Sequence, residues 1–339
     1  MDDSTSFHKP HVLKRGDTVG ILSPSSPAFE PGTINTSLGW LKKLGLQYRL
    51  SLGLNASYSS YAGSDEARAQ DLMRFFCDPE IKAILPLRGG SGSSRLLHLL
   101  DYQAIAANPK IIVGFSDITA LLVAINQKSN LVTFHGPTLN LMYENAYTYS
   151  YYQKALMSNS SIGLVTDPPE EQVWGQHYPP HRMIIAEGKA QGALTGGCLT
   201  LLRGLMGTPY EIDTRGKILF IEDVDEEPHN IDRMLCQLRL AGKLHQAAGI
   251  IFGASSGCRP GGSKRNTLTL NHSLEDVLRE RLGDLGIPVV FGMRFGHTAE
   301  KITLPLGVRA SLIATMAGVR FKIEEAACVD KTTSTQVQG

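Results

Sequence analysis

The sequence lacks the features that mark membrane, secreted and nucleic-acid-binding proteins. No apolar run reaches the roughly 18 residues of a membrane-spanning helix, and the N-terminal stretch MDDSTSFHKPHVLKRGD is acidic and polar, unlike a signal peptide. The 33 Lys and Arg residues nearly balance the 32 Asp and Glu residues, and they form no dense basic run. We therefore expect a cytoplasmic protein that acts on a small molecule or peptide and binds neither nucleic acid nor membrane.

Paired cysteines are also missing. The five cysteines are odd in number and none stands in a CxxC pair, which argues against a disulfide framework and against a zinc site. We expect reduced thiols at these positions: Cys77, Cys198, Cys236, Cys258 and Cys328.

The length and the apolar pattern predict two domains, because one core usually serves about 100 to 200 residues. From residue 17 to residue 128, apolar runs alternate with helical periodicity, which predicts an α/β domain with a parallel sheet. The later part is strand-rich with glycine turns and predicts an α+β domain with a large antiparallel share. The predicted segments are an N-terminal domain (1–155), a linker and mobile loop (156–185), a C-terminal domain (186–330) and a disordered tail (331–339).

A serine stands where a predicted strand gives way to a helix, in KIIVGFSDITALL (110–122). Ligands bind at the carboxyl ends of parallel strands, so the Ser116 hydroxyl is expected to project into a cleft. The amide of Asp117 would then lie at a helix N-terminus, where it can donate to a developing oxyanion. Only the first glycine of the hydrolase elbow G-x-S-x-G is kept, and both residues are also good helix caps. This stretch alone is consistent with two roles, a nucleophile at Ser116 or a helix cap at Ser116 or Asp117.

A glycine-rich loop follows another predicted strand, in LPLRGGSGSSRLL (85–97). Arg95 stands where the third glycine of the dinucleotide pattern belongs, and the Gly-Lys-Ser/Thr of a phosphate loop is absent, so no cofactor is expected. Gly89 and Gly90 let the backbone approach a ligand closely. The loop is a candidate to supply one amide of an oxyanion hole, and a tight turn without a ligand is the alternative.

A serine nucleophile needs a general base and a group that orients the base. Among ten histidines we favour His297, because it follows the apolar stretch IPVVFG and is presented from a strand end. Glu222 ends the strand ILFIE, where a buried carboxylate is costly unless a group such as histidine pairs with it. Strand ends also carry polar residues for solubility alone. The acidic residues that follow are interpreted as solvated loop charges: Asp223, Asp225, Glu226 and Glu227.

Seven blocks stand in one order between about residue 13 and residue 315: LKRGDTVGILSPSSP, DEARAQDLMRFFCDPEIKAILPLRGGSG, GFSDITALL, TFHGP, GGCLTLLRGLMGTPYEID, ILFIEDVDEEPHNIDRMLCQLRLAG and FGHTAEKITLPLG. Together they resemble the LD-carboxypeptidases, the serine-peptidase family that also holds the microcin C7 self-immunity proteins. The resemblance implies a flavodoxin-like N-terminal domain that carries the nucleophile Ser116, and a second domain that carries Glu222 and His297. It also implies a homodimer and no metal.

The implied activity is that of a serine carboxypeptidase. It would hydrolyse the L,D-peptide bond of murein tetrapeptides and release a terminal D-alanine during peptidoglycan recycling. The implied oxyanion hole uses the amide of Asp117 and one amide of Arg88, Gly89 or Gly90. We expect Arg88 or Arg294 to meet a substrate carboxylate, and His135, at the end of a strand in TFHGP, is a candidate to line the cleft.

Two positions depart from the family pattern and keep other functions open. Ser91 stands where tyrosine is usual, and Cys198 stands where asparagine is usual. One alternative is a microcin-immunity-like hydrolase of peptidyl-nucleotides, in which Trp174 would stack on a base; this tryptophan would otherwise cover the domain junction. The other alternative is a nonhydrolytic binding protein on the same fold.

Overall fold

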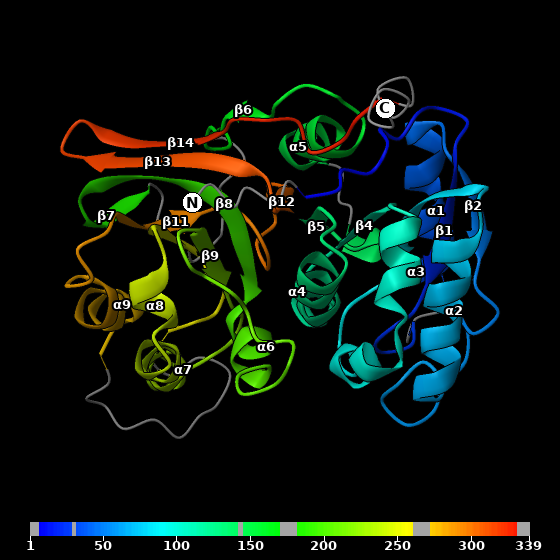
Figure 1. Ribbon diagram of the computed structural model, residues 1–339, viewed down its shortest axis with the longest axis horizontal. Helices are drawn as coiled ribbons and strands as arrows, with labels where there is room; N and C mark the ends of the chain where they lie inside the picture. The colour runs from blue at the N-terminus through cyan, green and yellow to red at the C-terminus, as the bar shows by residue number, and fades with distance from the viewer. Residues whose placement is uncertain (1–6, 29–31, 142–144, 170–181, 260–271, 331–339) are drawn as a thin grey trace. The chain divides into compact units, whose positions relative to one another are not determined.

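The chain divides into two compact units (Figure 1). The computed structural model describes residues 7–28, 32–141, 145–169, 182–259 and 272–330. The N-terminal unit comprises Met1–Ser161, Thr303–Val308 and Ala326–Gly339, and the C-terminal unit comprises Ile162–Ile302 and Arg309–Glu325. Residues 303–308 and 326–330, which the sequence pattern assigned to the second domain, fall in the N-terminal unit. Of the predicted linker and loop (156–185), the structure describes residues 156–169 and 182–185. The predicted tail at 331–339 lies outside the described residues.

The N-terminal unit is built on a six-stranded sheet in the order β12-β5-β4-β3-β1-β2. Strands β1 to β5 are parallel and follow the flavodoxin-like order 2-1-3-4-5, so the predicted α/β class is confirmed. β12 pairs antiparallel with β5. The strands are β1 (Thr18–Leu22), β2 (Gln47–Leu50), β3 (Ile81–Pro86), β4 (Ile111–Gly114), β5 (Thr133–His135) and β12 (Leu304–Leu306).

Helical segments connect the parallel strands β1 to β5, as crossover connections between parallel strands require. The Ser64 side chain caps α2 by accepting a hydrogen bond from the Ala67 amide at 3.2 Å. The segment after β3, expected to be an ordinary helix, is a 3₁₀ helix. The helical segments are α1 (Thr33–Leu44), α2 (Asp65–Cys77), η1 (Ser93–Leu99), α3 (Tyr102–Ala107), η2 (Ser116–Ile118), α4 (Thr119–Lys128), η3 (Leu139–Leu141) and α5 (Ala146–Leu156).

The C-terminal unit is built on an eight-stranded sheet in the order β6-β14-β13-β8-β9-β10-β11-β7. The four central strands β8 to β11 are parallel, and the flanking strands pair antiparallel. The antiparallel share was predicted, whereas the parallel centre was not. The strands are β6 (Gly163–Leu164), β7 (Met183–Ala186), β8 (Gly188–Cys198), β9 (Ile218–Glu222), β10 (Gly249–Gly253), β11 (Val289–Met293), β13 (Arg309–Thr315) and β14 (Gly318–Ile323).

The helices of this unit have clear start signals. α7 has proline at its first position, where the missing N–H costs nothing, and Ser273 and Asp276 form a capping box at the start of α9. The apolar face of α7 is buried through Ile231, Leu235 and Leu238. The helices are α6 (Leu199–Gly204), α7 (Pro228–Leu240), α8 (Lys243–Gln246) and α9 (Leu274–Leu282).

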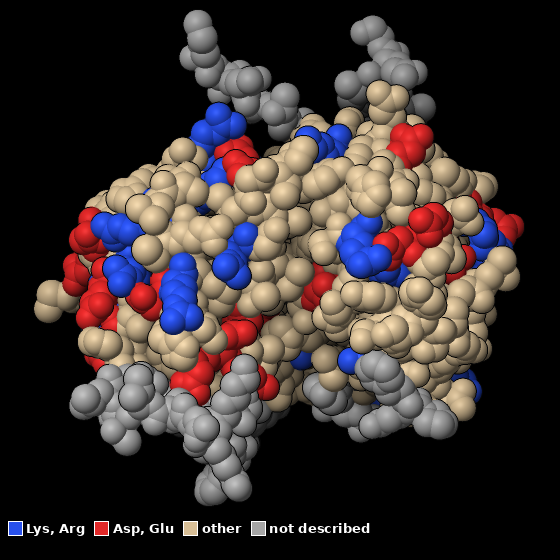
Figure 2. Space-filling view, turned by 90° about the horizontal axis from the view of Figure 1, so that it is seen from below, with Lys and Arg blue, Asp and Glu red and all other residues tan. Residues whose placement is uncertain are grey.

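Charges of both signs are interspersed on the face that Figure 2 presents, in agreement with the balanced composition. The central strands of both sheets are almost entirely buried, which explains why they are continuous apolar runs in the sequence. Within the described parts of the chain, we find no helix that is long and apolar enough to cross a bilayer.

Close strand packing makes Gly196 indispensable. Gly196 in β8 has φ 146°, and a Cβ at this position would lie 1.8 Å from the carbonyl oxygen of Phe220 in β9. We predict that Gly196→Ala lowers the free energy of unfolding by more than about 3 kcal/mol, because both the backbone conformation and the space oppose a side chain. Denaturant titration measures this change.

The matched control is Gly39→Ala in α1, where a Cβ would meet nothing within 4 Å. This change should stabilise the protein by about 0.5–1 kcal/mol, because alanine is the better helix former. A Gly196→Ala protein as stable as the wild type would contradict the account of this strand pair.

Candidate active site

In the C-terminal unit, a buried carboxylate holds a histidine. Glu222 is the last residue of β9 and its side chain is 0% exposed, whereas the His297 side chain is 18% exposed. Oε2 of Glu222 lies 2.7 Å from Nδ1 of His297 and accepts a hydrogen bond from the His297 amide at 3.1 Å. The contact expected from the two strand ends is therefore present. A ring held through Nδ1 is in the orientation in which Nε2 acts as a general base.

Two glycines make room for this carboxylate. Gly296 has φ 73°, and a Cβ there would lie 2.2 Å from Oε2 of Glu222. At Gly253, the end of β10, a Cβ would come within 3.0 Å of the Glu222 Cβ. The glycine before His297 thus permits both the left-handed turn and the close approach.

Burial and the charge of Glu222 together shift the pKa values of the neighbouring groups. Burial favours a lower pKa for His297, but the charge and hydrogen bond of Glu222 outweigh burial, and the pKa of His297 is raised above its ordinary value. Burial lowers the pKa of Lys301 to about 8, although the charges of Glu222 and Glu300 oppose this shift. Burial, followed by the charge of Glu222, raises the pKa of Asp223 to about 6.

Asp223 is not the solvated loop charge that we expected. It is 3% exposed, and its Oδ2 accepts hydrogen bonds from the amide and hydroxyl of Thr200 at 2.9 and 2.8 Å. The Cys198 thiol lies 3.7 Å from its Oδ1, and burial raises the pKa of that thiol. The sequence gives no sign of the contacts that Asp223 makes, because they form only when β8 and β9 pair in the sheet.

The other acidic residues of this loop divide between surface and interior. Asp225 is exposed, as expected, and has φ 53°. Glu227 is only 7% exposed, so its interpretation as a solvated charge was wrong. It is the N-cap residue of α7, directly before the buried Pro228.

In the N-terminal unit, Ser116 sits at a strained corner directly after β4 and Phe115. Its φ is 60°, a left-handed conformation that non-glycine residues rarely adopt, and its side chain is partly exposed. Gly89 lies against it, since a Cβ on Gly89 would come 3.1 Å from the Ser116 Cβ and 3.3 Å from its Oγ. A strained serine between strand and helix is the geometry of a nucleophile elbow.

The Asp117 side chain ties together the loops around this corner, a role that the sequence did not reveal. Its Oδ2 accepts hydrogen bonds from the Ser25 hydroxyl at 2.5 Å and from the Ser93 amide at 2.8 Å. The Ser93 hydroxyl donates to the Asp117 carbonyl. One buried residue thereby connects the segments that follow β1, β3 and β4.

The glycine loop after β3 packs on the segment after β1. Gly90 has φ 120°, and a Cβ there would lie 2.3 Å from Oγ of Ser26. That oxygen accepts a hydrogen bond from the Ser91 amide at 3.2 Å. Ser91, one of the two departures from the family pattern, is itself exposed.

The candidate substrate contacts differ in exposure. Arg88 is partly exposed, and its Nη1 is 3.4 Å from the Pro27 carbonyl oxygen. His135 is 0% exposed and packs edge-on against Phe115 at 6.3 Å between ring centroids, while Arg294 is 3% exposed. Arg88 is therefore the most accessible of the three candidates in this structure. Trp174 lies outside the described residues.

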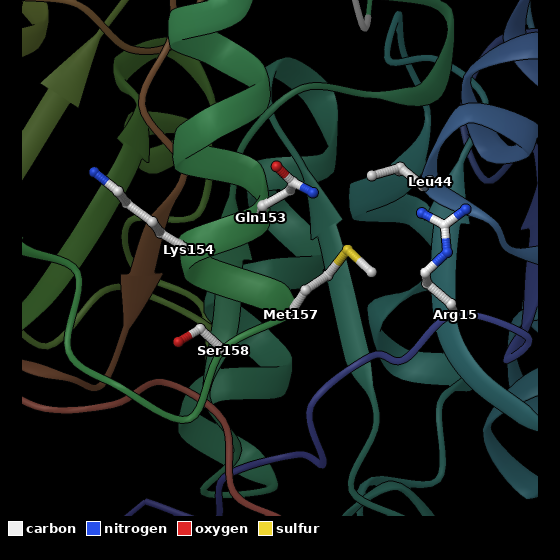
Figure 3. Close-up of a pocket in the computed structure, with 6 residues that line it drawn as sticks. All are labelled: Arg15, Leu44, Gln153, Lys154, Met157 and Ser158. Carbon is white, nitrogen blue, oxygen red and sulfur yellow. The ribbon is translucent and has the colours of Figure 1, made fainter.

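A separate hollow of about 410 Å³ lies in the N-terminal unit (Figure 3). Figure 3 shows Lys154 and Arg15 on opposite sides of it, with Gln153 and Met157 between them. None of the candidate site residues lines this hollow. Its lining consists of Arg15, Leu44, Gln153, Lys154, Met157 and Ser158.

Comparison with known proteins gives consistent matches across both units. Models of the LD-carboxypeptidase N-terminal and C-terminal domains match residues 19–136 and 191–312. The probable murein peptide carboxypeptidase of Bacillus subtilis (strain 168) is 40% identical over 309 residues, which is 90% of this chain and 91% of that protein. The microcin C7 self-immunity protein MccF of Escherichia coli is 33% identical over 322 residues, which is 88% of this chain and 91% of that protein.

A solved structure agrees with these relatives. The crystal structure of muramoyltetrapeptide carboxypeptidase from Oxalobacter formigenes superposes with a TM-score of 0.76 at 28% identity. The match covers 91% of this chain and 99% of the Oxalobacter formigenes chain. Because both domain models match and the relatives span nearly the whole chain, this protein belongs to the LD-carboxypeptidase family of serine-type carboxypeptidases.

Proposed function

We propose that this enzyme hydrolyses the L,D-peptide bond of murein tetrapeptides and releases the terminal D-alanine. The observation that carries the proposal is the 2.7 Å contact between Glu222 and His297, because a buried carboxylate that fixes an imidazole through Nδ1 is the base assembly of serine hydrolases. The names of the Bacillus subtilis and Oxalobacter formigenes proteins support the choice of a murein peptide as substrate.

In the proposed reaction, Nε2 of His297 takes the proton of the Ser116 hydroxyl as its oxygen attacks the scissile carbonyl. Glu222 stabilises the imidazolium that forms, and the amides of Asp117 and of Gly89 or Gly90 stabilise the oxyanion. The imidazolium then protonates the amine of the departing D-alanine, which leaves an ester on the serine. A water molecule, deprotonated by the same histidine, hydrolyses this ester and restores the free hydroxyl.

The substrate's terminal carboxylate needs a cationic partner. We assign this role to Arg88, because it is the most accessible of the candidate side chains and precedes the glycine loop. The homodimer, the cytoplasmic location and the role in peptidoglycan recycling also belong to this proposal. Size-exclusion chromatography with light scattering tests the dimer directly.

A second candidate substrate is a peptidyl-nucleotide, which the 33% identity to the microcin C7 self-immunity protein supports. Both candidate reactions use the same serine chemistry, so only the substrate differs. A nonhydrolytic binding protein finds no support, because the chain belongs to a family of carboxypeptidases.

Replacing the nucleophile tests the mechanism. We predict that Ser116→Ala reduces D-alanine release from a murein tetrapeptide by at least about 10³-fold, because no other group replaces the attacking oxygen. Mass spectrometry of the products measures the release, and thermal unfolding checks the fold. Ser94→Ala, a change at an exposed serine of η1, is the control and should leave the rate unchanged. A Ser116→Ala enzyme with substantial activity would exclude this serine as the nucleophile.

Replacing the orienting carboxylate tests the base. Because Glu222 raises the pKa of His297, the acidic limb of kcat/KM should lie above the ordinary histidine pKa in the wild type. Glu222→Gln removes the negative charge, so the pKa of His297 falls and the acidic limb moves to lower pH. We also expect kcat to fall by about 10³- to 10⁴-fold, as for other triad carboxylates.

The control for this experiment is Asp225→Asn, which neutralises an exposed carboxylate of the same loop. Its pH profile should match that of the wild type, because solvent screens the charge. An acidic limb that stays in place or moves to higher pH in Glu222→Gln would argue against His297 as the base.

Substrate choice is tested by assaying both candidates side by side. We predict that kcat/KM for a murein tetrapeptide exceeds that for a peptidyl-adenylate analogue by at least about tenfold, a difference of roughly 1.4 kcal/mol in transition-state binding. The opposite preference would favour the second candidate while leaving the serine chemistry intact.

A further inference from the structure

A buried arginine of the N-terminal unit has no part in the proposed chemistry. Arg68 lies on α2, and its side chain is 1% exposed. A buried guanidinium is costly unless its donors are satisfied, so its partners indicate what it does. Nη1 donates hydrogen bonds to the carbonyl of Pro24 at 2.5 Å and to the carbonyl of Gly92 at 3.0 Å. Nη2 pairs with Asp65 on the first turn of the same helix.

One carbonyl belongs to the glycine loop that supplies an amide of the proposed oxyanion hole, and the other belongs to the segment on which this loop packs. Pro24 follows β1, and Gly92 ends the glycine loop after β3. The other end of that loop, Gly89, lies against Ser116. Arg68 therefore holds the far end of the loop whose near end contacts the proposed nucleophile.

Such a loop needs support from outside, because its glycines allow many conformations. Gly90 and Gly92 both have positive φ, 120° and 111°. A Cβ at Gly92 would lie 2.6 Å from Cδ1 of Tyr61 and 2.9 Å from Nη1 of Arg68, so the backbone packs directly on these two side chains. Tyr61 in turn lies 5.2 Å from the Arg68 guanidinium, within the range of a cation–π contact.

We propose that Arg68 is a positioning residue that holds residues 89–92 of the glycine loop so that an amide of this stretch can meet the oxyanion. The inference rests on the proposed function, because it concerns the hole that this reaction uses. An oxyanion donor must be held to within a fraction of an ångström, and a displacement of about 1 Å costs roughly 100-fold in rate. The binding of the substrate's ground state does not depend on this donor, so the effect should fall on kcat.

Arg95 provides a matched control from the same cluster. It pairs with the same carboxylate, Asp65, at 2.8 Å, and it stacks on the same ring, Tyr61, at 5.0 Å. Its side chain is 53% exposed and donates to Asp65. Its backbone amide donates to the Gly92 carbonyl at 3.3 Å, a bond that an alanine variant keeps. The two arginines thus share their neighbours and differ in the contact of their side chains with the loop.

The experiment compares Arg68→Ala, Arg68→Lys and Arg95→Ala in the full chain. For Arg68→Ala we expect kcat for D-alanine release to fall by about 10- to 100-fold while KM changes by less than about threefold. Arg68→Lys keeps the charge but loses the forked donor, so an intermediate loss is expected. Arg95→Ala should stay within about twofold of the wild type, since exposed ion pairs contribute little.

Two further readouts separate positioning from general stability. Guanidinium at low millimolar concentration should restore part of kcat to Arg68→Ala, whereas a merely destabilised variant would lose activity. Hydrogen exchange should accelerate at the amides of residues 89–93 in Arg68→Ala, with the strands of the same sheet unchanged.

Each outcome decides between the two proposals. Equal kcat values for Arg68→Ala and Arg95→Ala, with unchanged exchange in the loop, would overturn the positioning role alone. A wild-type enzyme that releases no D-alanine would overturn the proposed function, and loop exchange would still report on Arg68. If Arg68→Ala fails to fold, the kcat and loop exchange of Arg68→Lys decide.

Discussion

The pairing of a fully buried carboxylate with a histidine is the interaction on which the C-terminal unit depends. Glu222 is 0% exposed, and His297 stabilises its charge twice, through the ring and through the backbone amide. Gly253 and Gly296 pack directly against Glu222, so a side chain at either glycine would collide with it. The same burial that makes the carboxylate costly also makes its charge strong enough to raise the pKa of the histidine.

The N-terminal unit meets a comparable constraint with hydrogen bonds. Ser116 adopts a left-handed conformation that costs free energy, on the order of 1 kcal/mol or more, and persists only if its surroundings enforce it. The Asp117 carboxylate ties the neighbouring loops to this corner, and the Arg68 guanidinium bonds the far end of the glycine loop that packs on Ser116. Both side chains are buried, and both bind loops that follow neighbouring parallel strands. Hydrogen bonds to the buried residue next to Ser116 therefore accompany its strained backbone conformation.

The ends of the parallel strands could be predicted because their pattern is local. An apolar run followed by Ser116, or by Glu222, marks the edge of a sheet where ligands bind, and parallel topology gathers such ends. The burial of Asp223 could not be predicted, since its partner Thr200 belongs to a neighbouring strand connection 23 residues earlier. The same applies to β12, whose pairing with β5 depends on a contact across more than 160 residues of chain.

The sequence by itself determined the parallel α/β sheet of the N-terminal unit, the strand-rich character of the C-terminal unit, and which serine, glutamate and histidine stand at strand ends. Apolar periodicity, glycine turns and capping residues carry that information within a few residues. Tertiary structure alone decided that the side chains of Asp117 and Arg68 bond to neighbouring loops and that the Asp223 side chain is buried. Those roles depend on which strands become neighbours, and a hydrogen bond between distant segments leaves no periodic trace in the chain.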